Sequence, residues 1–159
     1  MTGDATFEDG ADRPLNLGAM DLDDLSVVSS LVQDAVLPQV EIRWDRPARR
    51  VALLINRFRW EDRAAAERMG RPVERVQSVL SIDNVLAVSS QGLDRSNPDT
   101  VLSVLSIGFD ALDEVAGHVV LTFAGDGALR ARIEALEVRL KDVTRPYVAP
   151  SRKVPDHPE

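Results

Sequence analysis

The chain has 159 residues, of which 44% are apolar and 28% are charged, and this composition is typical of one globular domain rather than of a disordered chain or a membrane protein. Its formal net charge of -7 and its pI of about 4.9 oppose non-specific binding to nucleic acid or to an anionic membrane. The sequence contains no cysteine, which excludes disulfides, thiolate metal sites, iron–sulfur clusters and cysteine nucleophiles.

Both ends of the chain are predicted to be flexible tails, because neither carries enough large apolar side chains to offset its ordering entropy. Residues 1–13 form an acidic tail and residues 144–159 a proline-rich tail, which places a single domain at residues 14–143. Residues 1–10 lack the basic and apolar regions of a secretory signal, so we expect a cytoplasmic protein. The longest apolar stretches are far shorter than the ~20 residues of a membrane-spanning helix.

The first predicted elements are a short strand and a helix. Leu15, Leu17 and Ala19 alternate with Asn or Gly, as the residues of a strand do. Asp21 is expected to cap the N-terminus of a helix that Pro38 ends. The apolar stripe of this helix recurs at steps of three or four residues and consists of Leu22, Leu25, Val28, Val32 and Ala35 or Val36.

Three β-hairpins are predicted from alternating apolar and polar residues that turn residues connect. They join residues 40–44 to 50–55, residues 76–82 to 85–90, and residues 118–124 to 128–133. The strand at residues 51–55 is apolar on both faces and is expected to be central in the sheet. Asp83-Asn84 makes the second turn, and Gly125-Asp126-Gly127 supplies the positive φ values of the third.

Three further segments are less regular in pattern. Residues 101–112 carry apolar side chains at odd positions, which favours a strand, although residues 97–99 (Asn-Pro-Asp) would also cap a short helix. Residues 133–143 keep helical spacing while residues 136–140 also alternate, and we favour a helix. Residues 61–72 are interpreted as a mobile surface insertion, either a loop or one helical turn.

Together these elements predict an α+β domain in which one or two helices pack on a mainly antiparallel, curved sheet of about seven or eight strands. Pleckstrin-homology-like barrels share this outline. The outline predicts no activity, because such scaffolds host unrelated sites. Strands that flank long loops leave unpaired sheet edges, from which we expect a two-fold homodimer.

No metal or cofactor site is predicted. The chain has two histidines, His118 and His157, and the second lies in the proline-rich tail, so a histidine metal site would have one ordered ligand at most. The sequence contains no Gly-x-Ser-x-Gly elbow, no Walker pattern and no Gly-x-Gly-x-x-Gly loop.

Six carboxylates at predicted turns are the only candidates for acid–base catalysis. They are Asp83, Asp94, Asp110, Asp113, Glu114 and Asp126. A pair of them brought together in space would serve as general acid and base. Because aspartate is favoured at turns for its local hydrogen bonds, we interpret these residues as structural.

The most unusual run is Asn-Arg-Phe-Arg-Trp-Glu at residues 56–61. Strand alternation puts Arg57 and Arg59 on one face and Phe58 and Trp60 on the other. Arginine beside an aromatic ring binds phosphate, carboxylate or a stacked base. The simplest interpretation is that the two rings complete the core while the arginines pair with nearby acids. For a ligand or partner contact the candidates are Arg57, Arg59 and Trp60, and we expect both guanidinium groups to be exposed.

The second candidate contact is the loop at residues 92–99, through Asp94 and Arg95. The run Leu-Leu-Ile-Asn-Arg-Phe-Arg-Trp-Glu at residues 53–61 and the loop Gly-Leu-Asp-Arg-Ser-Asn-Pro-Asp resemble those of an uncharacterised, chiefly alphaproteobacterial family, DUF2948. The resemblance covers roughly residues 15–147 and implies that this region is one domain. It brings no substrate, cofactor or catalytic residue with it.

The sequence therefore favours a binding or protein-interaction module for an unidentified protein or small molecule, because no activated nucleophile, metal cluster or cofactor loop is present. Two alternatives stay open. One is a small hydrolase that uses paired carboxylates. The other is nucleotide or RNA binding through Arg57, Arg59 and Trp60, which the acidic net charge opposes.

Overall fold

The computed structural model describes residues 13–148, so the predicted tails at residues 1–12 and 149–159 lie outside it. Its residues form ten strands and two α-helices. In chain order these are β1 (Asn16–Ala19), α2 (Leu22–Val32), β2 (Val36–Pro38), the 3₁₀ turn η1 (Gln39–Glu41), β3 (Ile42–Asp45), β4 (Arg50–Phe58), the 3₁₀ turn η2 (Trp60–Asp62), α3 (Arg63–Arg68), β5 (Arg75–Ile82), β6 (Val85–Gln91), β7 (Val101–Ala111), β8 (Gly117–Phe123), β9 (Ala128–Ile133) and β10 (Val138–Asp142). The predicted α+β class is confirmed.

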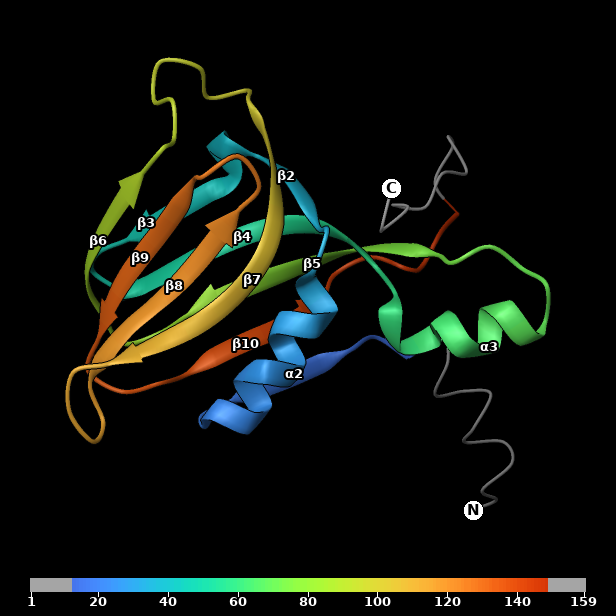
Figure 1. Ribbon diagram of the computed structural model, residues 1–159, viewed down its shortest axis with the longest axis horizontal. Coiled ribbons are helices and arrows are strands. Elements are labelled where there is room, and N and C mark those ends of the chain that lie inside the picture. The colour runs from blue at the N-terminus through green and yellow to red at the C-terminus, as the bar shows by residue number, and fades with distance from the viewer. Residues whose placement is uncertain (1–12, 149–159) are drawn as a thin grey trace.

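The strands form one open, curved sheet in the order β1-β10-β5-β4-β2-β7-β8-β9-β6, and β3 pairs with β4 beside β2. The sheet folds over itself, so that β6, β7, β8 and β9 lie across from β3, β4 and β5 (Figure 1). Within residues 13–148 neither helix is long and apolar enough to span a bilayer.

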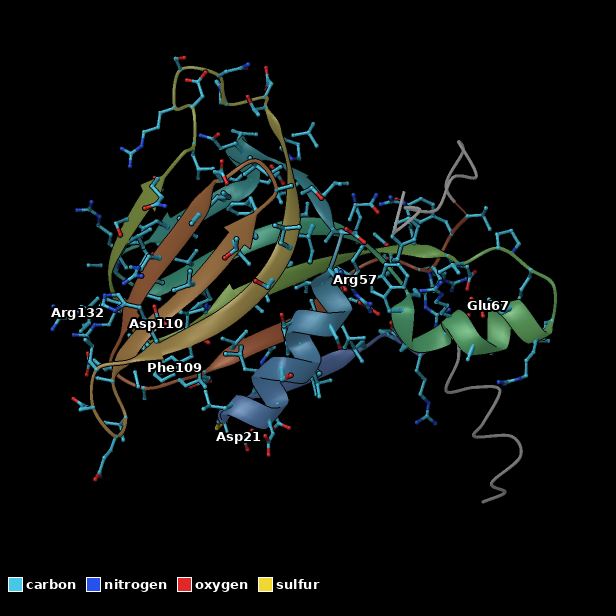
Figure 2. All side chains as sticks on the ribbon, in the orientation of Figure 1. Asp21, Arg57, Glu67, Phe109, Asp110 and Arg132 are labelled. Carbon is cyan, nitrogen blue, oxygen red and sulfur yellow. The ribbon has the colours of Figure 1, made fainter. Side chains whose placement is uncertain are left out.

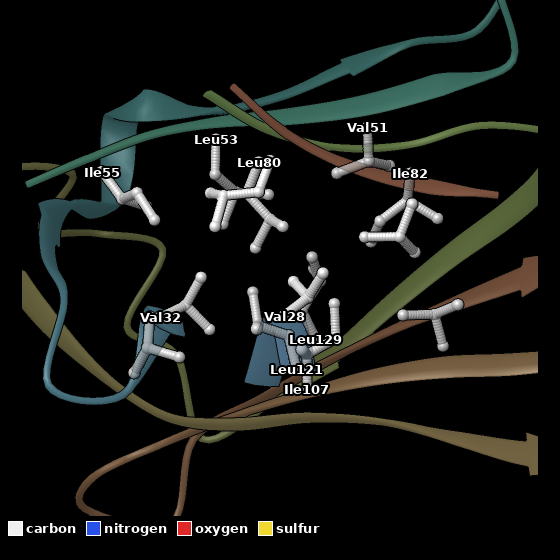
Figure 3. Packing of buried hydrophobic residues seen from close by; sticks show 14 of the residues in the cluster. Val28, Val32, Val51, Leu53, Ile55, Leu80, Ile82, Ile107, Leu121 and Leu129 are labelled. Atoms are coloured by element: carbon white, nitrogen blue, oxygen red, sulfur yellow. The ribbon is translucent and has the colours of Figure 1, made fainter. Parts of the chain in front are cut away.

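The core fills the space between the two halves of the folded sheet. Figure 3 shows side chains of β4 and β5 facing those of β7, β8 and β9, with two valines of α2 between them, and the labelled residues are Val51, Leu53, Ile55, Leu80, Ile82, Ile107, Leu121, Leu129, Val28 and Val32. The predicted central position of β4 is confirmed, since β5 pairs along one edge and β2 and β3 pair along the other. Helix α2 thus closes one side of the core.

Helix α2 begins where the sequence predicts and ends earlier. The Asp21 carboxylate accepts the Asp24 backbone N–H at 2.8 Å and caps the helix. The prediction that Pro38 ends the helix is wrong, because α2 ends at Val32. Asp34 has a positive φ of 65°, and Val36 is the first residue of β2 and pairs with β4 and β7. Leu22, which was predicted to lie on the apolar stripe, is 61% exposed.

The first and third predicted hairpins are confirmed, as β3 pairs with β4 and β8 pairs with β9. The second is wrong. Strands β5 and β6 both form, but β5 pairs with β4 and β10, whereas β6 pairs with β9. Asn84, with a φ of 61°, makes a corner that carries the chain from one half of the folded sheet to the other. Local alternation predicts a strand without specifying its partner.

Strand β7 forms as predicted, but its buried face changes along its length. Leu102 and Val104 are buried in its first half, whereas Val101 and Leu105 are exposed. An irregularity between Val104 and Ser106 in the pairing with β8 shifts the alternation, so that Ile107 is buried.

The helix favoured at residues 133–143 is wrong, because residues 138–142 form β10. Val138, Leu140 and Asp142 are buried on one face of this strand. The strand has partners along both edges, β1 and β5. Two ladders of backbone hydrogen bonds override the local helical spacing.

Residues 61–72, predicted as a loop or one helical turn, contain the end of η2 and the short helix α3. The buried Ala66 and Asp62 face the body of the protein. The mobility of this segment stays a prediction. Residues 144–148, assigned to the tail, lie beside β5, where the Tyr147 N–H donates to the Arg75 carbonyl at 2.8 Å.

Candidate functional site

The two predicted arginines lie inside the protein, so the expectation of exposed guanidinium groups is wrong. Arg57 is fully buried and Arg59 is 3% exposed. Figure 2 shows Arg57 where the sheet meets the segment that carries α3. The chain leaves β4 after Phe58, and η2 turns back over the strand end, so that both faces of this end are covered.

Arg57 is the centre of a cluster that we call the strand-end network, formed by the buried residues Arg57, Ser78 and Asp142 and by Glu61, which reaches the surface. Its Nε donates to Ser78 Oγ at 3.0 Å, and its Nη atoms donate to Glu61 at 2.8 and 2.9 Å and to Asp142 at 3.0 Å. Burial lowers the pKa of this guanidinium, but the hydrogen bonds and charges of Glu61 and Asp142 outweigh burial and raise the pKa above its usual value. The group is therefore charged.

A second cluster, the helix-base network, consists of Arg59, Asp62, Arg71 and Glu74. Arg59 donates to Glu74 at 2.7 Å and to Asp62 at 3.5 Å. Arg71 donates two hydrogen bonds to the Asp62 carboxylate, at 2.7 and 3.1 Å. The interpretation that the arginines pair with nearby acids is confirmed, and these pairs hold α3 against the strand end.

Trp60 is half-buried and contributes internal contacts. Its Nε1 donates to the Gln33 carbonyl at 2.9 Å, which connects η2 to the end of α2. Its ring centroid lies 5.3 Å from that of Phe58, and the Arg63 guanidinium lies 5.5 Å from the Trp60 centroid. The structural roles predicted for the two rings agree with these contacts. A ligand contact at this run stays a prediction.

The two candidate contact residues in the loop at residues 92–99, Asp94 and Arg95, have different surroundings. The Asp94 carboxylate accepts the backbone N–H of Ser96 at 3.0 Å and its hydroxyl at 2.6 Å, so it stabilises the turn. The hydroxyl first and the N–H second lower the pKa of Asp94. Arg95 donates to Ser90 Oγ at 3.3 Å and lines a hollow in the surface.

This hollow, which we call the arginine groove, lies between β3 and β6. It is lined by Trp44, Arg46, Arg49, residues 85–88 and Arg95. Its volume of about 660 Å³ falls within the range of roughly 300–1,000 Å³ that is usual for ligand sites. Arg46 and Arg49 lie in the turn between β3 and β4, and Arg95 lies in the loop after β6.

The charge of the groove is opposite to that of the whole chain. Three of its lining residues are arginines and none is acidic, although the net charge of the chain is -7. Arg49 pairs with the exposed Glu134. Within residues 13–148, Arg46 and Arg95 form no ion pair. Such guanidinium groups are suited to bind carboxylates or other anions.

Four of the six candidate carboxylates, Asp83, Asp94, Asp110 and Asp113, have local partners. Asp83 pairs with Arg50 at 2.6 Å, and Asp110 pairs with Arg130 at 3.3 Å. Asp113 and Asp126 lie in the turns at opposite ends of β8, about 20 Å apart at the usual strand rise. In the described part of the chain no three His, Asp or Glu side chains are grouped so as to hold a metal ion.

The family model for proteins of unknown function DUF2948 matches residues 15–157. The chain belongs to the DUF2948 family. No curated protein and no solved structure matches this chain.

Of the arginines that line the groove of this DUF2948 chain, Arg95 is a contact residue predicted from the sequence, whereas Arg46 and Arg49 are not. A signal for them was present in the run Arg-Trp-Asp-Arg-Pro-Ala-Arg-Arg at residues 43–50, which has four arginines among eight residues of an acidic chain. The run was interpreted as a hairpin turn. The turn is correct, and it presents Arg46 and Arg49 to the groove.

The helix-base network should make this DUF2948 protein sensitive to acid. The hydrogen bond from Arg71 first, and the charges of Arg59 and Arg71 with it, hold the pKa of Asp62 below its usual 3.8 against the effect of burial. The unfolded chain therefore binds this proton at a higher pH than the folded chain. The stabilisation from Asp62 is fully present above its unfolded pKa and is lost as the pH falls through the folded pKa.

We expect the free energy of unfolding of the natural chain to fall more steeply between about pH 4 and pH 2 than that of Asp62→Asn. Urea unfolding at a series of pH values measures both slopes. Asp99→Asn, in an exposed loop, is the control and should keep the natural slope. Equal slopes in the natural chain and in Asp62→Asn would contradict the role given to Arg71.

Proposed function

We propose that this protein is a binding module that holds an acidic, extended segment of a partner protein in the arginine groove. The observation that carries the proposal is the arginine groove itself, in which Arg46 and Arg95 have no carboxylate partner within residues 13–148. The net charge of the chain is -7, whereas the lining of the groove carries three arginines and no acidic residue. A local field of this kind favours anionic ligands and speeds their encounter.

The groove also has apolar surface, which indicates that its acidic ligand carries apolar side chains as well. Trp44 is half-buried, and Leu86 is 45% exposed, so both offer apolar surface beside the arginines. A ligand that carries carboxylates and apolar side chains satisfies both kinds of surface, and a protein segment supplies them together. Aromatic and arginine side chains are also the residues that contribute most to binding at protein interfaces.

Selection from a random peptide library displayed on phage, with the full chain as target, tests the proposal. We expect the selected peptides to be enriched in Asp and Glu. Their affinity, measured by fluorescence anisotropy, should fall about tenfold or more in Arg46→Glu and in Arg95→Glu, because each loses a charge-assisted hydrogen bond and gains repulsion.

Arg43→Glu is the matched control. Arg43 lies on β3 next to Trp44, its side chain is 73% exposed, and alternation puts it on the other face of the strand. Its replacement should leave the affinity unchanged. Peptides without acidic enrichment, or peptides whose binding survives both groove substitutions, would refute the proposal. Stronger binding of a labelled RNA oligonucleotide at the same arginines would favour a nucleic-acid function instead.

A further inference from the structure

Strand β6 is one end of the sheet. Within residues 13–148 it pairs with β9 along one edge and with no strand along the other. The Val85 N–H donates to the Arg49 carbonyl at 2.9 Å, which fixes the start of the strand beside the turn that carries Arg46 and Arg49. On the opposite side of the groove, β3 pairs with β4 alone. The arginine groove therefore lies between two strands that each have a free edge.

The groove borders the start of β6. Residues 85–88 all line it. The irregularity between Val85 and Ala87 lies within this stretch, so the usual alternation of faces does not apply along it. The Val85 N–H donates to the carbonyl of Arg49, which also lines the groove, so the edge of β6 that does not pair with β9 faces the turn that carries Arg46 and Arg49.

The free edge of β6 has one of the features that commonly prevent pairing, an irregularity at its start, and lacks the others. Edge strands are commonly short or carry Lys, Pro or inward-pointing charges. The sequence of β6 is Val-Leu-Ala-Val-Ser-Ser-Gln, with seven residues and neither a charge nor a proline. At the other end of the sheet β1 has four residues. The irregularity of β6, between Val85 and Ala87, lies at its start and leaves the rest regular.

We propose that the acidic segment binds by adding a strand to the free edge of β6. The inference rests on the proposed function and deepens it. Backbone hydrogen bonds to β6 supply affinity that depends little on sequence, while Arg46 and Arg95 select for acidic side chains. A second copy of this chain is a poorer occupant, because pairing of two β6 edges brings two sets of groove arginines together, and like charges across a pair of strands repel.

Backbone N-methylation of the strongest selected acidic peptide tests this mode of binding. An N-methyl group removes one donor and blocks the edge at that residue. Because alternate N–H groups of an added strand point to its partner, methylation at every second residue should lower the affinity about tenfold or more, and methylation at the residues between should not. Amide hydrogen exchange followed by NMR should show alternate amides of β6 becoming protected when the peptide binds.

The outcomes separate the two proposals. If peptides bind through Arg46 and Arg95 but N-methylation shows no alternation, strand addition is wrong and the binding function stands. If no acidic peptide depends on these arginines, both are wrong. Light scattering gives a further check, since a dimer whose β6 amides are protected without peptide would show that a second copy occupies the edge and would overturn strand addition.

Discussion

Replacing Arg57 by alanine should lower the free energy of unfolding by about 3–5 kcal/mol, because removal of one partner leaves buried charges without compensation. Arg57 is fully buried, and the Asp142 side chain that it contacts is 3% exposed. Without the guanidinium, Asp142 keeps the Ser78 hydroxyl and the Leu15 N–H as donors but loses its only cation within residues 13–148. Glu61 loses two hydrogen bonds at the same time.

Urea unfolding monitored by circular dichroism measures this loss. Arg63→Ala is the control, because Arg63 is exposed and makes two weak contacts. Its i,i+4 pair with Glu67 at 3.0 Å contributes about 0.3–0.5 kcal/mol, and its contact with the Trp60 ring contributes about 0.5–1 kcal/mol. If Arg57→Ala does not fold, Arg57→Lys should show an intermediate loss, since lysine keeps the charge without the fork that reaches three side chains and the Phe58 carbonyl. A loss in Arg57→Ala as small as that in Arg63→Ala would contradict the buried network.

Replacing Phe58 by alanine should cost about 3–5 kcal/mol, the usual range for a buried phenylalanine. The side chain is 1% exposed. Its ring lies 4.0 Å from the Arg75 guanidinium and 5.3 Å from the Trp60 ring centroid. The truncation therefore creates a cavity and also removes a cation–π and an aromatic contact.

The same unfolding experiment on Phe58→Leu provides the comparison, because leucine refills much of the cavity and should cost under about 1.5 kcal/mol. Trp60→Ala should cost less than Phe58→Ala, since Trp60 is only half-buried. If Phe58→Ala and Phe58→Leu lose the same small amount, the Phe58 pocket is able to collapse and the ring does not anchor the strand end.

Most strands could be predicted from the sequence, because alternation is a local property that side chains alone determine. Partners could not. Residues 76–82 and 85–90 fulfil every local condition of a hairpin, yet β5 and β6 belong to different halves of the folded sheet. The β10 segment shows the same limit, since it fits a helix until β1 and β5 supply hydrogen bonds on both sides.

The run at residues 56–61 was recognised as unusual, and the pairing of its arginines with nearby acids was anticipated. Their burial was not. Strand alternation assigns one face to solvent, but η2 and α3 fold back over this end and cover both faces. The partners of Arg57 include Ser78 and Asp142. Ser78 lies 21 residues after Arg57, and Asp142 lies 64 residues after Ser78, so no local sequence pattern connects them.

The arginine groove was predicted only through Arg95. Its other arginines, Arg46 and Arg49, come from a turn 49 and 46 residues earlier in the chain, and they lie near Arg95 because the sheet folds over itself. The excess of arginine at residues 43–50 was visible in the sequence. The position of these arginines in a groove could not be predicted, since a charged turn on an acidic protein is ordinarily solvated surface.

The pairing of β1 with β10 has a consequence for folding during synthesis on the ribosome. The Leu15 N–H donates to Asp142, 127 residues later, and within residues 13–148 the only strand that pairs with β1 is β10. At a synthesis rate of about 5–20 residues per second, β1 leaves the ribosome on the order of ten seconds before β10 exists. The fold is therefore completed only after β10 has been synthesised, and during that interval β1 lacks the strand with which it pairs.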